Sequence, residues 1–230
     1  MSADSLTMLS SMATRAILSE LMAEFGLATA CSVKLESAGG VDVARRVQAG
    51  EVVDVVVLAA NAIDQLVSDG RLHGTSRVDF ARSGMGMAIQ SGQPMPEVGS
   101  QAAVRDAVLA APTVGVSTGP SGKYLVSLFE RWGISQQIAT RIVQAPPGVP
   151  VATLVARGDV ALGFQQLSEL MGVPGIDVLG PLPPDIQHIT LFSAAVSASC
   201  TRPDAARALL DFLGAPASAA SKRRHGMEPA

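Results

Sequence analysis

The stretch Thr113–Phe129 reads TVGVSTGPSGKYLVSLF, and it contains the change of pattern that decides the fold. It opens with β-branched residues and then, after Ser121 and Gly122, places apolar residues three and four positions apart. This pattern predicts a buried strand, a loop of small residues and a helix. The first N–H groups of a helix lack partners within it, and the helix dipole is positive there, so such a loop can hold an anion.

Two similar transitions come earlier in the chain. Leu6–Leu9 leads into Ser10 and Ser11, and Val33–Glu36 leads into Ser37, with a helical pattern after each. Three strands that end in serine-containing loops predict an oxyanion-binding cleft, in which Ser11, Ser37 and Ser121 lie within reach of one small ligand. The alternative is an ordinary connection in which Ser121 only caps its own helix.

Composition excludes several classes of function. The 230 residues carry a net charge of −3, and only 3% are aromatic, so the chain offers neither a basic surface nor stacking platforms for nucleic acid. No apolar run is long enough to span a membrane. Cys31 and Cys200 show no metal-ligand spacing and suit small buried residues, although a disulfide stays open. We expect no metal and no cofactor.

The N-terminus shows no signal-peptide pattern before the first predicted strand. The chain as written is therefore expected in the cytoplasm, and in the periplasm if a leader has been removed. We expect a monomer.

The order of the elements predicts an α/β fold of two lobes with mixed, mostly parallel sheets. The first 70 or so residues alternate strand and helix three times, which is the doubly wound pattern. Arg77–Gln90 is a long extended stretch with two internal glycines, and Ile189–Val196 is a second apolar strand. We expect these two segments to cross between the lobes and to form a hinge. The predicted lobes are residues 1–82 with 189–230, and the inserted residues 83–188.

Some expectations are local. Gly26 is expected to end the first helix after Phe25, and Asn61 to cap the third helix. Gly172–Pro184 is rich in Gly and Pro and is expected to be irregular. The run Lys222–Arg224 is expected to be a solvated helix end. Asp54, which opens a buried strand, is expected to fix backbone geometry.

The chain resembles the type II periplasmic binding proteins, specifically the molybdate-binding group of extracellular solute-binding proteins. The resemblance rests on Ser10–Met12, Ser37–Gly40, Ser121–Tyr124 and Val155–Gly163, in this order along the chain. It implies a two-lobed clamp that closes on a small anion. For an exported form, it also implies an ABC importer permease as partner.

The resemblance also implies a set of ligand-binding positions. In this chain they are Ser11 or Ser10, Ser37, Ala59 or Ala60, Ser121, Val149 and Gln165. Gln165 stands where the molybdate-binding proteins carry tyrosine, and Ser168-Glu169 stands where they carry Thr-Asp. An amide in place of a phenol suits a larger ligand with several acceptors, such as an organic acid. A branch of similar proteins contains enzymes that resemble aconitate isomerase, and Gly163–Leu170 looks closer to that branch.

Three cations are candidates for holding a carboxylate. Arg15 lies near the first serine loop, Arg82 on the first crossing strand, and Lys123 in the first turn of the helix after Ser121. The alternative for Arg15 and Lys123 is a solvated side chain.

Two functions follow. The leading one is a binding protein for a small anion, with an organic di- or tricarboxylate favoured over molybdate. The alternative is an isomerase on the same scaffold that shifts a proton across an allylic carbon of a polycarboxylate. The latter needs one positioned base, for which Glu169, His188 and Lys123 are the candidates, although each also suits a structural or solvated role.

Overall fold

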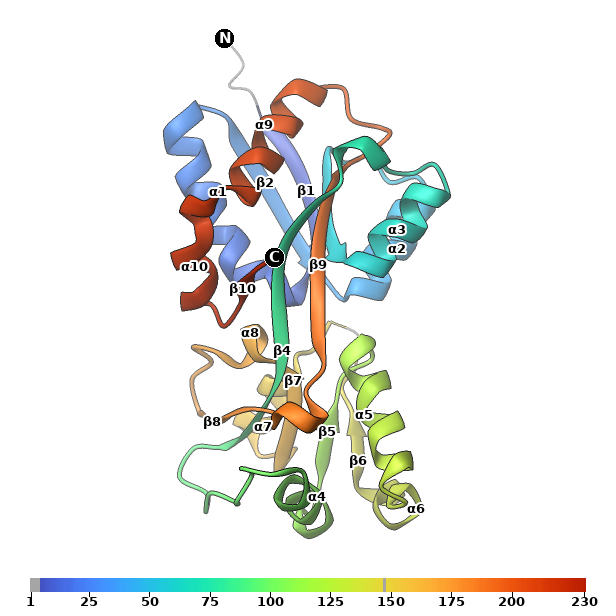
Figure 1. Ribbon diagram of the computed structural model, residues 1–230, viewed down its shortest axis with the longest axis vertical. Coiled ribbons are helices and arrows are strands. Elements are labelled where there is room, and N and C mark those ends of the chain that lie inside the picture. The colour runs from blue at the N-terminus through green and yellow to red at the C-terminus, as the bar shows by residue number, and fades with distance from the viewer. Residues whose placement is uncertain (1–4, 147) are drawn as a thin grey trace. The chain divides into compact units, whose positions relative to one another are not determined.

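The computed structural model describes residues 5–146 and 148–230, and these divide into two compact units. Unit 1 contains the described chain up to Ser83 together with Thr190–Ala230, and unit 2 contains Gly84–Ile189. Each of these boundaries lies one residue later than predicted from the sequence. Figure 1 shows the elements of both units. Among the described residues, no helix has the length and apolar character to cross a membrane.

Unit 1 contains two sets of elements. Its strands are β1 (Ser5–Ser11), β2 (Ser32–Ala38), β3 (Val55–Ala59), the first part of β4 (Val78–Gln90), nearly all of β9 (Ile189–Val196), and β10 (Glu228–Pro229). Its α-helices are α1 (Arg15–Thr29), α2 (Gly40–Gln48), α3 (Ala60–Ser68), α9 (Pro203–Gly214) and α10 (Ala219–Arg224).

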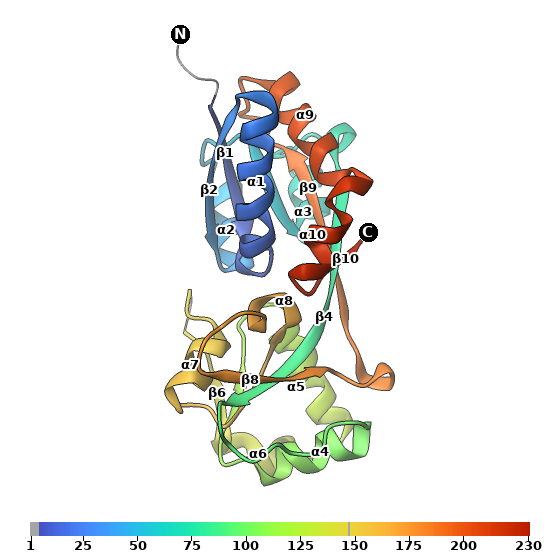
Figure 2. The ribbon, with the colours of Figure 1, turned by 90° about the vertical axis from the view of Figure 1, so that its left-hand side faces the viewer.

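The sheet of unit 1 is covered on both faces. Its strand order is β2-β1-β3-β9, with β1 parallel to β2 and β3, and β9 antiparallel to β3. Val55 and Val57 pack in a core cluster with α1 and α9, whereas Val56 and Leu58 pack in another with α2 and α3. Figure 2 shows α1 beside β1 and β2. Burial on both faces explains the near-continuous apolar run of β3.

Unit 2 has the same kind of architecture. Its strands are the second part of β4, β5 (Val114–Val116), β6 (Ile142–Gln144), β7 (Leu162–Gln166) and β8 (Ile176–Pro181). Its α-helices are α4 (Gln101–Ala110), α5 (Pro120–Arg131), α6 (Ser135–Ile138), α7 (Val151–Arg157) and α8 (Leu167–Leu170). The strand β5 is parallel to β6 and β7, and β4 pairs antiparallel with β7 and β8. The predicted strand, loop and helix over Thr113–Phe129 are confirmed by β5 and α5.

Several local predictions are wrong. The helix α1 continues past Gly26 to Thr29 and ends at Ala30, whose φ of 59° is left-handed. The helix α3 begins at Ala60 without a side-chain cap, so Asn61 lies inside it. The segment predicted to be irregular contains β8, which antiparallel pairing with β4 stabilises although its composition does not favour a strand.

The glycines of β4 permit close packing, as expected for glycine within a strand. A Cβ on Gly86 would lie 2.9 Å from a methyl of Leu167 and 3.1 Å from a methyl of Leu170. The short helix α8 therefore packs directly on the β4 backbone. This contact fixes the position of α8 within unit 2.

The run Lys222–Arg224 is only partly solvated. Arg223 and Arg224 are exposed, but Lys222 is buried, with 2% of its surface accessible. Its Nζ donates to the carbonyl of Leu213 at 2.9 Å and lies 4.9 Å from the Phe80 ring centroid. The prediction fails at Lys222 because α10 folds back onto the core of unit 1. Cys31 is buried and Cys200 half-buried, and both are thiols.

Candidate functional site

Two of the predicted serines meet at the end of β1 and β2. Ser10 and Ser37 are paired in register on these parallel strands, so their side chains point to the same face. The two hydroxyl oxygens lie 2.7 Å apart. Ser10 is fully buried and also donates to the carbonyl of Ser11, whereas Ser37 is half-buried. Ser37 is thus the more accessible hydroxyl of the pair, and Ser10 supports it.

Ser11 has a hydroxyl partner, Thr14, that was not among the predicted site residues. Its Oγ lies 3.4 Å from Oγ1 of Thr14, which is fully buried and donates to the Ser11 carbonyl at 3.1 Å. A Cβ on Gly40, the first residue of α2, would lie 3.7 Å from Cβ of Ser11. Ser11 therefore lies beside the start of α2. The Ser-x-x-Thr spacing of the two hydroxyls is the signal that could have identified Thr14.

Three strand-to-helix transitions share one edge of the unit 1 sheet, because β1, β2 and β3 are parallel. Ala59 ends β3 and caps α3 through its backbone, and Ala60 begins that helix. Both alanines are half-buried, and their side chains offer no polar atom. Any contact they make with an anion is limited to backbone N–H groups.

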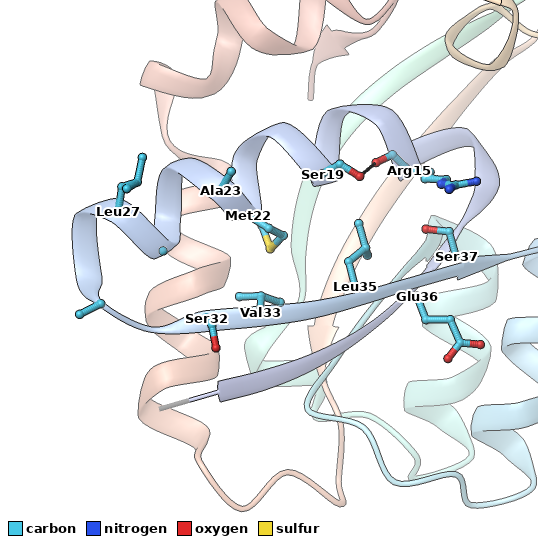
Figure 3. A pocket seen from close by; sticks show the side chains of 12 residues that line it. Arg15, Ser19, Met22, Ala23, Leu27, Ser32, Val33, Leu35, Glu36 and Ser37 are labelled. Carbon is cyan, nitrogen blue, oxygen red and sulfur yellow. Dashed lines mark hydrogen bonds between the residues drawn. The ribbon is translucent and has the colours of Figure 1, made fainter. Parts of the chain in front are cut away.

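A groove of about 820 Å³ runs between α1 and β2. Figure 3 shows Arg15 and Ser37 at one end of it, while Met22, Leu27 and Val33 lie further along. Arg15 is the first residue of α1 and is exposed. Unit 1 therefore brings a cation and a hydroxyl, both predicted as ligand contacts, to the same groove.

Ser121 belongs to a tight turn in unit 2. Its Oγ lies 2.8 Å from Oγ of Ser117, which also accepts from the N–H of Gly122 at 3.2 Å. A Cβ on Gly122 would lie 1.8 Å from the Ser117 carbonyl oxygen, so only glycine fits there. The helix α5 is capped by Gly119, with Pro120 as its first residue. The alternative that Ser121 caps its own helix is therefore wrong, and Ser117 was not among the predicted site residues.

Gln165 and Glu169 form a pair at the carboxyl end of β7. The buried Gln165 accepts from the N–H of Ala152 through Oε1 at 3.1 Å, and its Nε2 donates to Oε1 of Glu169 at 2.7 Å. Burial of Glu169 raises its carboxyl pKa to about 7, although the hydrogen bond from Gln165 opposes this rise. Glu169 is thus not the exposed acid that the alternative interpretation described.

The other candidates in unit 2 differ in surroundings. The ring of His188 stacks on Tyr124 with 4.6 Å between centroids, and burial lowers the pKa of His188. The Tyr124 hydroxyl donates to the carbonyl of Ile186 at 2.8 Å. Lys123 is exposed on the first turn of α5, and Val149 is half-buried in the loop before α7. His188 and Tyr124 therefore have structural partners.

Two further residues belong to unit 1. Arg82 is exposed on β4, where its backbone pairs with Glu228 of β10. Asp54 accepts from the N–H and hydroxyl of Thr7 at 2.8 and 2.9 Å. Burial favours the neutral acid, but these hydrogen bonds and Arg202 keep the pKa of Asp54 below its ordinary value. The expectation that Asp54 fixes backbone geometry is confirmed. The convergence of Ser11, Ser37 and Ser121 on one ligand stays a prediction.

Comparisons with known proteins identify the family. An aconitate isomerase from Pseudomonas sp is 38% identical over 185 residues, which cover 80% of this chain and 70% of that protein. The periplasmic molybdate-binding protein of Azotobacter vinelandii has a TM-score of 0.82 at 18% identity, covering 96% of this chain and 98% of its own. The sulfate-binding protein SubI of Mycobacterium tuberculosis H37Rv has a TM-score of 0.76 at 15% identity, and the match covers 99% of this chain and 87% of SubI. These structural matches confirm the predicted fold.

Residues 6–228 match the family described as bacterial extracellular solute-binding protein, and the chain belongs to that family.

Proposed function

We propose that this protein binds a small organic di- or tricarboxylate. The proposal rests on the observation that Arg15 and Ser37, whose hydroxyl is hydrogen-bonded to Ser10, line the same end of the groove in unit 1 (Figure 3). Ser37 can donate to one carboxylate oxygen, and the guanidinium of Arg15 can pair with a carboxylate in bidentate geometry. The names of the structural relatives, which bind molybdate and sulfate, support an anionic ligand.

The preference for a carboxylate over molybdate rests on two residues. Arg15 is exposed, so it can pair with a planar carboxylate. A hydrogen bond to a charged group contributes about 1.5–3 kcal/mol, which corresponds to roughly tenfold or more in affinity. Gln165 stands at the position of the tyrosine in molybdate-binding proteins. Its Oε1 already accepts a hydrogen bond from the N–H of Ala152, and its Nε2 already donates one to Glu169. It is therefore poorly placed to replace that tyrosine.

A second function is an isomerase that shifts a proton within an allylic polycarboxylate. The relative named aconitate isomerase favours it, because the identity of 38% extends over most of this chain. The carboxyl of Glu169 also favours it, because a pKa near 7 allows a group both to accept and to return a proton at neutral pH.

The physiological setting is part of the proposal. Several relatives of this chain are named as periplasmic or ABC-transporter binding proteins, and an exported form would deliver its ligand to an importer permease. We propose a monomer, which size-exclusion chromatography with light scattering tests directly.

Calorimetry on the full chain tests the ligand class. The panel is cis-aconitate, trans-aconitate, citrate, molybdate and sulfate. We expect tighter binding of at least one carboxylate than of molybdate or sulfate, and a weakening of about tenfold in Arg15→Ala. The matched control is Arg207→Ala, which removes an exposed arginine of α9 in the same unit. Tight molybdate binding without a response to any carboxylate would overturn the proposal.

Variants in unit 2 test whether the same ligand depends on both units. If Ser121→Ala weakens the same carboxylate as Arg15→Ala, the predicted clamp is supported. If it leaves the affinity within twofold, Ser121 is not part of the site. Arg82→Ala tests the remaining predicted cation in the same titration.

A further inference from the structure

Glu169 has a fixed backbone position. It belongs to α8, which follows β7 directly and packs on Gly86 of β4 through Leu167 and Leu170. Leu170 is completely buried. The carboxyl of Glu169 thus starts from a rigid element, which is what a group in acid–base chemistry requires.

The amide of Gln165 then fixes the carboxyl itself. Because Oε1 of Gln165 accepts from the Ala152 N–H, the amide cannot turn over without losing that hydrogen bond. The Nε2 group therefore faces Glu169 and donates to its Oε1. Gln165 is the one hydrogen-bond donor to Glu169 among the residues that the structure describes. No other described side chain donates to the second carboxyl oxygen, Oε2.

The charges near Glu169 are few. The strand β7 contains no titratable residue, and Asp177, the titratable residue of β8, accepts from the hydroxyl of Ser91 and the N–H of Gly92. The strand β4 contributes no titratable residue to unit 2. Within the described part of the chain, Glu169 forms no ion pair, unlike the paired carboxylates Glu20, Glu36 and Glu51. Its protonation therefore depends on burial and on Gln165.

We propose that Glu169 is the catalytic residue that moves the proton in the isomerase reaction, and that Gln165 is its positioning residue. This inference rests on the second proposed function. Of the three bases that the sequence offered, His188 is stacked on Tyr124 and Lys123 is exposed. Glu169 is buried and is held by the neutral amide of Gln165.

The proton transfer by Glu169 needs no reactant other than the substrate. Oε2 of ionised Glu169 takes a proton from the methylene carbon next to the double bond of an aconitate-type substrate. The electron pair of the broken C–H bond forms the new double bond, and the old double bond shifts its electrons toward the far alkene carbon, with charge spread onto a substrate carboxylate. The protonated Glu169 then returns a proton to that far carbon, so the double bond has moved and Glu169 is ionised again.

Proton NMR in heavy water tests the proposal on the full chain with cis- or trans-aconitate. Wild type should exchange the methylene and vinyl protons for deuterium while the isomers interconvert. Glu169→Gln should lower the exchange rate at least ~100-fold, with aconitate affinity kept within threefold by calorimetry. The matched control is Glu130→Gln, which removes an exposed carboxyl of α5 in the same unit and should leave the rate unchanged.

Gln165→Met tests the positioning role, because it keeps the shape of the side chain and removes its hydrogen bonds. The hydrogen bond from Gln165 lowers the pKa of Glu169, so its loss should move the rising limb of the pH–rate profile to higher pH. A purely structural role would lower the rate without moving that limb.

The outcomes separate the two levels of the proposal. If wild type binds aconitate but exchanges no protons, the isomerase function fails and this inference with it. If wild type exchanges protons and Glu169→Gln stays within threefold, the function stands and the assignment to Glu169 is overturned. Should Glu169→Gln fail to fold, Glu169→Asp decides, since a shorter carboxyl should bind aconitate but exchange at least tenfold more slowly.

Discussion

Ser10 and Ser37 are 27 positions apart in the sequence, and their hydroxyl oxygens lie 2.7 Å apart at the ends of two parallel strands. The buried Ser10 has one hydroxyl proton, which it can donate either to Ser37 or to the Ser11 carbonyl. When Ser10 donates to Ser37, the hydroxyl proton of Ser37 is free to be given to another acceptor. The pair is thus suited to present a donor rather than an acceptor, which is what an anion requires.

Ser37→Ala tests this donor. We expect carboxylate affinity to fall about fivefold to tenfold, because one hydrogen bond to a charged group is lost. Calorimetry measures the change, and Ser68→Ala is the control, since Ser68 is exposed at the end of α3 in the same unit and does not line the groove. Equal affinities for wild type and Ser37→Ala would remove Ser37 from the site.

Most of the fold could be predicted because it follows from local patterns. The β-branched run of β3 and the helical spacing of α5 specify their elements directly, and parallel strands then place Ser10 beside Ser37. The strand β8 could not be predicted, because its backbone is extended by pairing with β4, more than 80 residues away in the chain. Burial of Lys222 likewise depends on where α10 docks.

Some residues of the candidate site could likewise be predicted from the sequence, and others could not. The serine loops are visible in the sequence, because small hydroxyl residues follow apolar strands. The roles of Ser117 and Thr14 are less visible, because each acts through a hydroxyl whose partner is set by a turn. From the sequence, Gln165 and Glu169 could be predicted as two separate site residues but not as a hydrogen-bonded pair. The hydrogen bond from Ala152 that orients the pair comes from a different helix.

Gln187 should be important for the stability of unit 2. Its Oε1 accepts from the N–H of Met85 at 2.7 Å, and its Nε2 donates to the carbonyls of Met85 and Leu182 at 3.1 and 3.2 Å. The side chain thus replaces a neighbouring strand beside β4. Gln187→Met should destabilise the protein by about 1–3 kcal/mol, because the Met85 N–H of β4 loses its side-chain acceptor.

Urea denaturation measures this loss. The matched control is Gln136→Met, since Gln136 is exposed on α6. A denaturation midpoint for Gln187→Met equal to that of the control would show that water replaces the side chain at no cost.

Gly122→Ala should disrupt the turn before α5. The added methyl would lie 1.8 Å from the Ser117 carbonyl oxygen, so the loop backbone has to move. We expect a destabilisation of more than ~2 kcal/mol and weaker binding of any ligand that uses Ser121. Gly99→Ala is the control, because nothing lies within 4 Å of a Cβ there and its φ is not left-handed. If thermal denaturation gave the two variants equal midpoints, the tight turn would be refuted.

Glu20 should link acid stability to the docking of α10 on α1. Its carboxylate accepts hydrogen bonds from His225 at 2.8 Å and from Arg224, and these contacts, with Ser221, lower its pKa to about 2. Because the pKa is lower in the folded protein than in the unfolded chain, the folded state favours the ionised form. The stabilisation is complete above the ordinary pKa of 4.5 and is lost as the pH falls toward 2.

Glu20→Gln should therefore lower the melting temperature by about 1–3 °C at pH 6, and the difference should shrink between pH 4.5 and 2. The control is Glu24→Gln, an exposed residue one turn later on α1. Calorimetric melting across this pH range measures both variants, and a difference that is independent of pH would mean that Glu20 acts through packing rather than through its charge.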